Sequence, residues 1–571
     1  MSVFFNGRLL TTPTTASVVN DEAMRNQNLS VGNIAAFVGR CSGGAPKTAL
    51  RFASPAQAKK VLRKGELLEA VLKAFDPSDE TGSPAEVIAV RVNPADAAEL
   101  VLKDASSADV IKLASIGYGL GENQINVKVE SGSLLGKRVT VQRETAYYTA
   151  DNVGRAAFSV EYTGAEATAQ ITVTGTTVTL AAPTGTTVAA IDLTDFPTVG
   201  ALVDRINAAP GFQAAVQGRS DTQPSLNALD YVSAQSVKGA VFTVRADLQA
   251  IVDWFNGANQ DLVRAERLNA VGTLPANVPF TYLTGGSDGT TTFTDWADAF
   301  EALQKVDVQW VTPISPDEAV HALADTHASF CSDQLRKERR VICGTAASTS
   351  DADAMAKAKA LNSDRTSLIH LGYYDYDLNG KLVLMPPYMA AALIAGAFSG
   401  VNPGTPLTNK TIKVRGLERD LINPTDTDEL IKAGVLCLEN TEDGYKVVKS
   451  ISTWRQNDNY NRVEQSCGFA LDYTVRNVRQ AVDVLRGQKA NPLLLSRTVS
   501  IAQTTLKELA RAEPEGPGVL AGDDASPPFR NIKATLEGDV TRLEFECSPV
   551  IPNNYILVTV YAVPYSGSVS A

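Results

Sequence analysis

Hydrophobic and polar positions alternate between strand-like and helix-like spacing over the first part of the chain. Short apolar runs at 32–40 and 85–92 are bounded by turn residues, which predicts two buried strands. Between them, Ser54 and Gln57 stand at the two positions of a capping box, so a helical region begins there. Further on, apolar residues recur on one helical face: Leu67, Leu68, Val71, Leu72 and Phe75. This strand–helix–strand order predicts an α/β layer.

Residues 131–289 follow a different pattern. The stretch 169–193 is rich in Thr and Val and is broken by Gly-Thr turns, which is typical of β structure. We interpret 131–289 as an inserted domain that lies on the outer surface. The α/β spacing returns at about 290, where Trp296, Phe300 and Leu303 share one helical face.

The last part of the chain predicts two helices, at 471–488 and 500–513, and two closing strands, at 542–550 and 553–563. The expected fold is therefore mixed α/β and multidomain, with an α/β core, an inserted β-rich outer domain and extended terminal arms. In chain order, the parts are an N-terminal arm (1–25), the first part of the core (26–130), the insert (131–289), the second part of the core (290–440) and a C-terminal domain that ends in a strand arm (441–571).

Composition narrows the classes of function. A chain of 571 residues is too long for a single hydrophobic core, so we expect two to four domains. Its content of 44% hydrophobic and 20% charged residues is ordinary for a folded protein. A net charge of -11 disfavours a general nucleic-acid binder. No apolar run reaches the roughly 18 residues of a membrane span, and the first residues lack the order of a signal peptide. The six scattered cysteines are expected to be reduced and buried.

The stretch GRCSGGAPKTALRF, Gly39 to Phe52, imitates a phosphate-binding loop. Such a loop needs a glycine before its lysine, but Pro46, which has no N–H, precedes Lys47. The next residues alternate like a strand, so we interpret the stretch as a turn between strands. A second glycine-rich stretch, Gly117 to Val129, also runs into a strand and lacks the helix that binds pyrophosphate.

The chemically reactive residues do not point to an enzyme. His327 and Cys331 are four residues apart on a predicted helix, but His321 lies off that face, and two ligands do not complete a zinc site. The acidic clusters look like first-turn residues of helices. We therefore expect no catalytic, metal-binding or cofactor-binding residues and no cofactor.

Several landmarks, in their shared order, resemble the contractile-tail sheath proteins of bacteriophages. Residues 32–75 resemble the family's strand, glycine turn and helix, and Gly117 to Val129 resembles its Gly-x-x-Gly-Asn-x-Ile strand entry, although Glu122 interrupts the motif. Three later segments resemble its alanine-rich helix with a proline turn, its late helix–strand–turn pattern and its terminal strand: 385–418, 425–454 and 549–563. The resemblance covers most of the chain except about 131–289.

The resemblance implies a structural virion subunit that polymerises as stacked hexameric rings around a tail tube and contracts to drive the tube through the host envelope. The energy would be stored in subunit contacts rather than in a nucleotide. Expected partners are further copies of the chain, the tail tube protein, and the baseplate and tail terminator proteins, without direct nucleic-acid contact or membrane insertion. Assembly is expected in the host bacterial cytoplasm.

Two other interpretations stay open. The sheath of a bacteriocin-like or secretion-type contractile injection system would share every feature given so far. The interpretation as a secreted filament or adhesin protein would account only for the Thr/Val-rich β pattern of the insert.

The family links its subunits through terminal arms that add strands to a neighbour's sheet, a form of β-augmentation. Both ends of this chain are candidates, although a terminal strand commonly closes its own domain's sheet. The expected arm residues are Val3, Phe4, Phe5, Tyr555, Ile556, Leu557, Val558 and Val560.

The predicted helix 471–488 offers a basic face to an acidic tube. Arg476 and Arg479 share a face, and Arg486 lies one heptad beyond Arg479. An apolar stripe is expected opposite them, formed by Val475, Val478, Val482 and Leu485. The alternative is a solvated face. The predicted tube-contact residues are Arg476, Arg479, Arg486 and Lys489.

Overall fold

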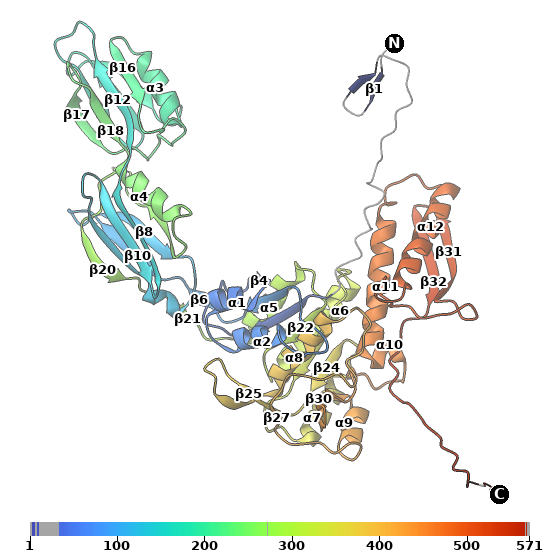
Figure 1. Ribbon diagram of the computed structural model, residues 1–571. Helices are drawn as coiled ribbons and strands as arrows, with labels where there is room; N and C mark the ends of the chain where they lie inside the picture. Colours follow the sequence, from blue (N-terminus) through green and yellow to red (C-terminus); the bar gives the residue numbers. More distant parts are fainter. Residues whose placement is uncertain (1–2, 6–7, 11–32, 271, 566, 568–571) are drawn as a thin grey trace.

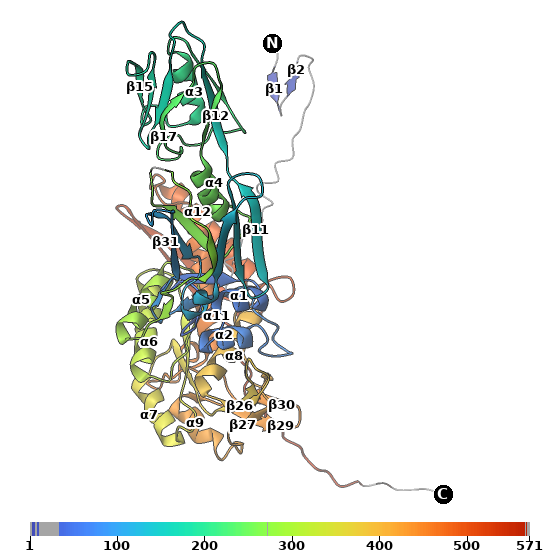
Figure 2. The same cartoon turned by 90° about the vertical axis from the view of Figure 1, so that its left-hand side faces the viewer.

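The computed structural model describes residues 3–5, 8–10, 33–270, 272–565 and 567. Figure 1 shows three parts: a central α/β core, a projecting part on one side, and a unit of helices and a hairpin on the other. Figure 2 shows the projecting part rising well away from the core. The mixed α/β, multidomain fold class expected from the sequence is confirmed.

The core is built on a seven-stranded sheet with the strand order β28-β24-β23-β22-β3-β5-β4. All neighbours pair in parallel except β4, which runs antiparallel to β5. The pairing of β3 with β22 joins the two halves of the core that the projecting part separates in sequence. The strands are β3 (Ala35–Gly39), β4 (Ala49–Phe52), β5 (Val87–Arg91), β22 (Trp310–Pro313), β23 (Arg340–Gly344), β24 (Thr366–Ile369) and β28 (Val435–Leu436).

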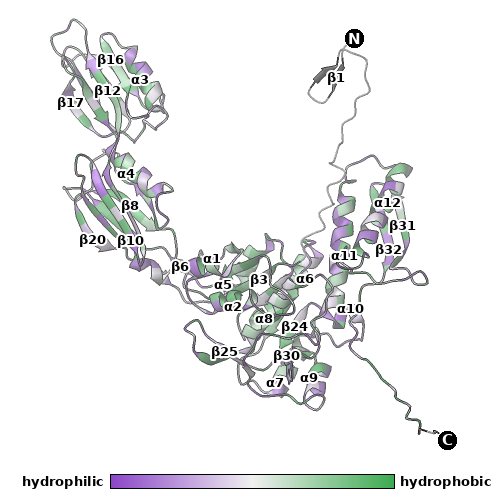
Figure 3. Ribbon diagram, viewed as in Figure 1, coloured by the Kyte–Doolittle hydropathy of each residue, from purple (hydrophilic) through white to green (hydrophobic). Residues whose placement is uncertain are grey.

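Helices cover both faces of this sheet, which explains why its strands are continuous apolar runs. Ala35 and Phe37 of β3 pack against one layer of helices, and Ala36 and Val38 pack against the other. The first layer contains α1 (Pro55–Leu62), α2 (Glu66–Ala74) and α8 (Pro387–Gly400). The second contains α5 (Phe293–Gln304), α6 (Glu318–Asp333), α7 (Asp351–Leu361) and α9 (Thr427–Ala433). Figure 3 shows hydrophobic residues concentrated along β3 and α8.

Two small antiparallel sheets lie at the lower end of the core (Figure 1). One has the order β26-β25-β27, and the other is the hairpin β29-β30. Their bounds are β25 (Tyr373–Tyr376), β26 (Leu382–Met385), β27 (Gly416–Leu417), β29 (Leu438–Thr441) and β30 (Gly444–Val447).

The projecting part begins and ends where β6 (Ala95–Asp96) pairs with β21 (Ser287–Asp288). The unit next to the core has its own apolar centre and combines two sheets with one helix. Its elements are β7 (Glu99–Lys103), β8 (Asp109–Ser115), η2 (Leu120–Gln124), β9 (Asn126–Ser131), β10 (Lys137–Arg143), β11 (Ala146–Val153), α4 (Asp247–Asn256), β19 (Val263–Arg267) and β20 (Val278–Tyr282).

A second unit lies beyond the first and has a separate apolar centre. Its elements are β12 (Ala156–Tyr162), β13 (Gln170–Val173), β14 (Thr177–Ala181), β15 (Thr187–Asp192), α3 (Val199–Asn207), β16 (Phe212–Val216), β17 (Val232–Ser236) and β18 (Phe242–Arg245). The projection therefore has two cores and starts near residue 97, earlier than the expected 131. β8 pairs with β19 from the far end of the insert, a long-range register that local composition does not reveal.

The C-terminal unit packs two long helices against a hairpin. Its elements are α10 (Tyr460–Val463), α11 (Gln465–Asp483), α12 (Pro492–Leu509), β31 (Phe529–Glu537) and β32 (Val540–Cys547). The two helices and the strand expected at 542–550 are present. Residues 553–563, expected as a closing strand, are not paired with any described strand.

Candidate assembly surfaces

The end of the chain forms an arm with almost no contact with its own protein. Residues 551–565 contain neither helix nor strand, and Figures 1 and 2 both show them leaving the body as an extended trace. Exposed fractions rise from 76% for Tyr555 to 92% for Leu557 and 96% for Tyr565. Burying one such side chain is worth about 1.5–3 kcal/mol. An arm with this many exposed apolar residues gains strongly by binding another surface.

The arm is fixed at its root. The Val550 N–H donates to the Val519 carbonyl at 3.1 Å, and Asn554 Nδ2 donates to the buried Glu464 carboxylate at 2.8 Å. Lys449 Nζ lies 3.2 Å from the same carboxylate. Burial raises the pKa of Glu464, and Lys449 opposes this shift. The direction in which the arm leaves is therefore set at Asn554.

The β31–β32 hairpin has two unpaired strand edges within the described part of the chain. One face is partly buried against the helices through Phe529, Ile532, Leu543 and Phe545. An isolated two-stranded sheet is marginal in water, and its free edges present unsatisfied N–H and C=O groups. This hairpin is a ready acceptor for a further strand.

The N-terminal residues expected to form an arm lie in a second hairpin. β1 (Val3–Phe5) and β2 (Arg8–Leu10) pair antiparallel, with Val3 opposite Leu10 and Phe5 opposite Arg8. Among the described strands, this hairpin joins no other sheet. The rest of the expected arm, from 11 to 25, lies outside the described residues.

Helix α11 is held against the core by ion pairs at Glu338, just before β23. The Glu338 carboxylate accepts hydrogen bonds from Arg479 Nη1 and Nη2 at 2.7 and 2.8 Å. Arg476 Nε lies 3.4 Å from it and Arg476 Nη1 lies 3.0 Å from Asp307. Burial alone would raise the pKa of Glu338, but Arg479 and Arg476 hold it below its ordinary value of 4.5. These pairs make the contact between α11 and the core partly ionic.

A second ionic cluster anchors the first half of α11. Arg340 Nε lies 3.0 Å from the Asp472 carboxylate, and Arg365 Nη1 lies 3.2 Å from it. Arg340 Nη1 also donates to Gln465 Oε1 at 2.9 Å. Arg340 is almost fully buried, and burial lowers its pKa. Three carboxylates, of Asp307, Glu338 and Asp472, and four guanidinium groups thus set the position of this helix.

Because of these ion pairs, the basic face expected on the helix 471–488 is only partly exposed. Arg476 is only 4% exposed and lies inside the protein, whereas Val475 of the expected apolar stripe is 40% exposed. Arg479 is 30% exposed at its side chain and is engaged by Glu338. The side chain of Arg486 is 77% exposed, and Lys489 is exposed in the turn after α11. The acids that pair with the buried Arg476, Asp307 and Glu338, lie just before β22 and β23, so the helix's own pattern could not reveal them. Tube contact by the four residues stays a prediction.

The two glycine-rich stretches are turns, as predicted. Residues 40–48 connect β3 to β4, and Lys47 Nζ pairs with Asp295 at 2.9 Å and Asp298 at 2.6 Å at the start of α5. Gly117 to Val129 passes through η2 into β9 rather than into an α-helix.

The candidate zinc ligands have other partners. His327 Nε2 accepts a hydrogen bond from Arg339 at 2.9 Å, and burial together with Arg339 lowers the pKa of His327 to about 3. In the described ranges, no cluster of three or more potential ligands could hold a metal ion. Within the same ranges, no helix has the length and apolar character needed to cross a membrane.

Free sheet edges and exposed apolar arms are features through which chains bind one another. Residues 289–453 match the family model of the phage tail sheath protein central domain. The chain is 28% identical to the tail sheath protein of Bacillus phage SP01, covering 99% of this chain and 98% of that protein. It is also 28% identical to a putative tail sheath protein of Enterococcus phage phiEF24C, over 97% of each. Over almost its whole length the chain is therefore similar to the tail sheath proteins of phages, and its residues 289–453 match their central domain.

Solved structures agree on the fold. A sheath tail protein from Listeria innocua superposes with a TM-score of 0.54 and 13% identity, covering 90% of this chain and 92% of that one. A sheath tail protein from Desulfitobacterium hafniense gives a TM-score of 0.51 and 12% identity, covering 94% and 100%.

Proposed function

We propose that this chain polymerises as stacked rings around a tail tube and that contraction of the polymer drives the tube through the host envelope. The observation that carries the proposal is the exposed apolar arm rooted at Asn554, in a unit that also presents a hairpin with free edges. Negative-stain electron microscopy of the concentrated chain tests it, because the polymer is a hollow cylinder. Assembly takes place in the host cytoplasm, with the baseplate and tail terminator proteins at the two ends.

The arm of one subunit binds the β31–β32 hairpin of another by adding a strand. Tyr555, Ile556, Leu557, Val558 and Val560 supply unpaired backbone groups and side chains that prefer burial. Each added backbone hydrogen bond is worth about 1 kcal/mol net. At the other end of the chain, the β1–β2 hairpin supplies a further strand edge to which a neighbouring subunit can pair. Linking through both ends keeps subunits connected while their rigid cores rotate.

The turn after α11 contacts the tube through Arg486 and Lys489, with Arg479 beside them. Charged side chains at the rim of an interface are individually weak, at about 0.2–1 kcal/mol each. Many weak contacts repeated along a polymer hold the tube and still release it. Arg476, engaged with Glu338 and Asp307, contributes by holding the helix in place.

Reversing the charge of both Arg486 and Lys489 to Glu should abolish assembly on preformed tubes without changing thermal stability. Both side chains are exposed, so the substitutions disturb no packing. Assembly is measured by pelleting with tubes and by electron microscopy. Arg511→Glu is a matched control, because this arginine is also exposed and lies in the same unit. Undiminished tube binding by the double variant would contradict the tube contact.

The projecting part faces outward and adds little to the contacts between subunits. Replacing residues 97–286 by a short glycine linker should leave a chain that folds and polymerises. The two cut ends are neighbours, because Asp96 pairs with Ser287. Polymerisation is measured by sedimentation and the polymer's diameter by electron microscopy, with a thinner cylinder expected. A folded variant that stays monomeric would show that the projection is part of the interface.

The proposal applies equally to a bacteriocin-like or secretion-type contractile sheath, since the same arms and core would serve either assembly.

A further inference from the structure

The projecting part is joined to the core by a narrow ribbon. The chain leaves the core through β6 and returns through β21, and these two short strands pair with each other. Figure 1 shows this ribbon as the link between the two parts, with α1 beside it. The apolar clusters of the core and of the projecting part have no described residue in common. Among the described residues, therefore, no shared hydrophobic cluster fixes the two parts in one orientation, and relative motion is the expectation for such a junction.

One buried arginine holds the foot of this ribbon. Arg91, at the end of β5, is fully buried, and its Nη2 lies 2.6 Å from the Asp288 carboxylate in β21. Arg91 Nη1 donates to the carbonyl of Gly44 in the core at 3.3 Å and to that of Tyr118 in the projecting part at 3.4 Å. Breaking a buried ion pair of this kind is strongly unfavourable. The foot of the ribbon is therefore fixed.

Away from the ribbon, α1 contacts the projecting part through an exposed ion pair. Lys60 Nζ lies 2.7 Å from the Asp261 carboxylate, and the two side chains are 74% and 47% exposed. The Tyr148 hydroxyl donates to the same carboxylate at 2.9 Å. Lys60, together with Tyr148, holds the pKa of Asp261 below its ordinary value, so the carboxylate is charged at neutral pH. Exposed pairs are individually weak and are screened by salt, so this contact is readily broken.

Arg63, which follows the last residue of α1, makes a second contact with the projecting part. Its Nε lies 3.7 Å from the Glu122 carboxylate, and its Nη1 lies 3.7 Å from the Glu144 carboxylate. Glu122 is already paired at 2.8 Å with Arg143, inside the projecting part. The contact of Arg63 is therefore long and secondary, and its loss leaves the buried pair of Glu122 intact.

The backbone at Arg63 is strained. Its φ is 62° and its ψ is -62°, a combination that residues other than glycine seldom adopt. The Lys64 N–H donates to the Leu62 carbonyl at 2.8 Å, so Arg63 is the central residue of a three-residue turn of the strained type. Such strain persists only where the surrounding contacts impose it, and it is frequent at segments that switch between two arrangements. The strain at Arg63 thus coincides with its contact to the projecting part.

We propose that the projecting part turns on the core about the β6–β21 ribbon, and that Lys60 and Arg63 form a latch that holds it in the orientation of Figure 1. Opening the latch breaks two weak contacts and releases the strained turn, while Arg91 keeps the foot of the ribbon in place. Within the proposed polymer, this joint lets neighbouring projections move apart when the cores repack. The joint belongs to the single chain, so its test does not depend on polymerisation.

Single-molecule fluorescence energy transfer in the full chain tests the joint, with one dye at Leu134 in the projecting part and one at Leu378 in the core, both exposed positions. The wild-type chain at low salt should give one narrow distribution of distances. Lys60→Glu alone and Asp261→Lys alone should each raise the fraction of molecules outside this peak about tenfold. About 1 M salt should act in the same direction. Combining the two substitutions restores the ion pair with its charges exchanged and should bring the fraction back toward the wild-type value.

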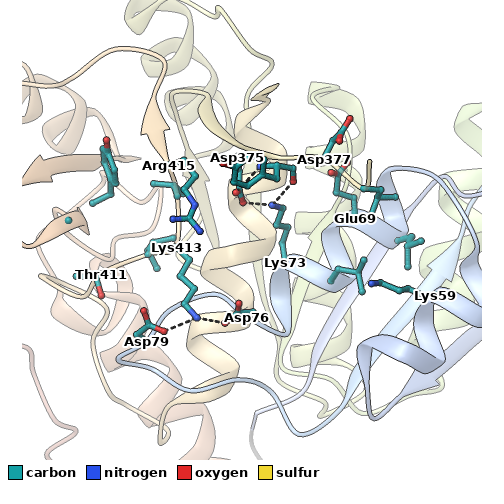
Figure 4. A pocket seen from close by; sticks show the side chains of 18 of the residues that line it. Lys59, Glu69, Lys73, Asp76, Asp79, Asp375, Asp377, Thr411, Lys413 and Arg415 are labelled. Atoms are coloured by element: carbon teal, nitrogen blue, oxygen red, sulfur yellow. Dashed lines mark hydrogen bonds and ion pairs between the residues drawn. The ribbon is translucent and has the colours of Figure 1, made fainter. Parts of the chain in front are cut away.

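Lys59→Glu is the matched control, because it makes the same change of charge one residue earlier in α1. Figure 4 shows Lys59 at the edge of a cleft of about 880 Å³ between α2 and the segment 411–415, where no contact with the other residues drawn is marked. This variant should leave the distribution of distances unchanged, and circular dichroism confirms that every variant is folded.

Arg63→Gly removes the second half of the latch together with the strain, because glycine adopts a positive φ at no steric cost. It should loosen the joint without lowering the melting temperature. A distribution that stays narrow in Lys60→Glu, in Asp261→Lys and at high salt would overturn the proposal. So would a double variant no narrower than its parents, or a broad distribution for the wild-type chain at low salt.

Discussion

Removing residues 555–571 should leave a folded chain that no longer polymerises at any accessible concentration. The described apolar residues of this segment, between Tyr555 and Tyr565, are mostly exposed in the single chain, so the deletion should barely change the melting temperature. Within a polymer the same residues are proposed to form a strand on a neighbour's β31–β32 hairpin. Losing several backbone hydrogen bonds and several buried apolar side chains removes many kcal/mol from each contact. Sedimentation velocity of the truncated and full chains measures the result.

Proline substitutions distinguish the contribution of the arm's backbone hydrogen bonds from that of its side chains. Leu557→Pro with Val558→Pro removes two adjacent N–H groups, one of which must face the neighbouring strand. Leu557→Val with Val558→Thr keeps both N–H groups and serves as the matched control. The proline variant should stay monomeric and the control should polymerise. Polymers of normal length from the proline variant or from the truncated chain would show that the arm does not link the subunits.

Replacing Glu338 by Gln should destabilise the protein by about 3 kcal/mol at neutral pH, because it leaves the buried guanidinium of Arg476 and the engaged Arg479 without their shared charge. The amide keeps the shape of the carboxylate, so the loss reports on charge rather than on packing. Chemical denaturation of both chains, each as a monomer, measures the difference in the free energy of unfolding. Glu508→Gln is the control, since its pair with Arg511 is half exposed and its loss should leave the free energy of unfolding almost unchanged.

The loss of stability caused by Glu338→Gln should itself depend on pH. The pKa of Glu338 in the folded chain is below its ordinary value of 4.5, so its carboxylate stabilises the folded state fully above that value. As the pH falls below 4.5 and through the lower folded pKa, this stabilisation is lost. The stability difference between wild type and Glu338→Gln should therefore shrink in that acidic range. A difference that is constant with pH, or absent at neutral pH, would contradict the ionic attachment of α11.

Much of the core could be predicted from local sequence. The runs around Phe37 and Ile88 become fully buried strands, and Ser54 accepts the hydrogen bond from the Gln57 N–H that starts α1. The stretch around Pro46 connects two strands, as its alternating pattern predicts. These features succeed because they depend on neighbours in sequence, through periodicity, capping and turn chemistry.

The remaining features depend on partners distant in sequence. The projection starts near residue 97 because β8 pairs with β19, which no local signal indicates. Arg476 is buried because Glu338 and Asp307 approach it from the core, so a basic position that looks solvent-exposed on a helical wheel is internal. The β25–β26 hairpin, by contrast, has a local signal in its Asp-Leu-Asn-Gly turn, Asp377 to Gly380.

The most direct measurement is negative-stain electron microscopy of the purified full chain at high concentration, with and without its tube. We expect hollow, helically ridged cylinders, which should be shorter and wider in the sample without tube because contraction releases the energy of the stretched state. Dispersed single molecules in both samples, from protein shown to be folded, would contradict the central claim that this chain is the subunit of a contractile sheath.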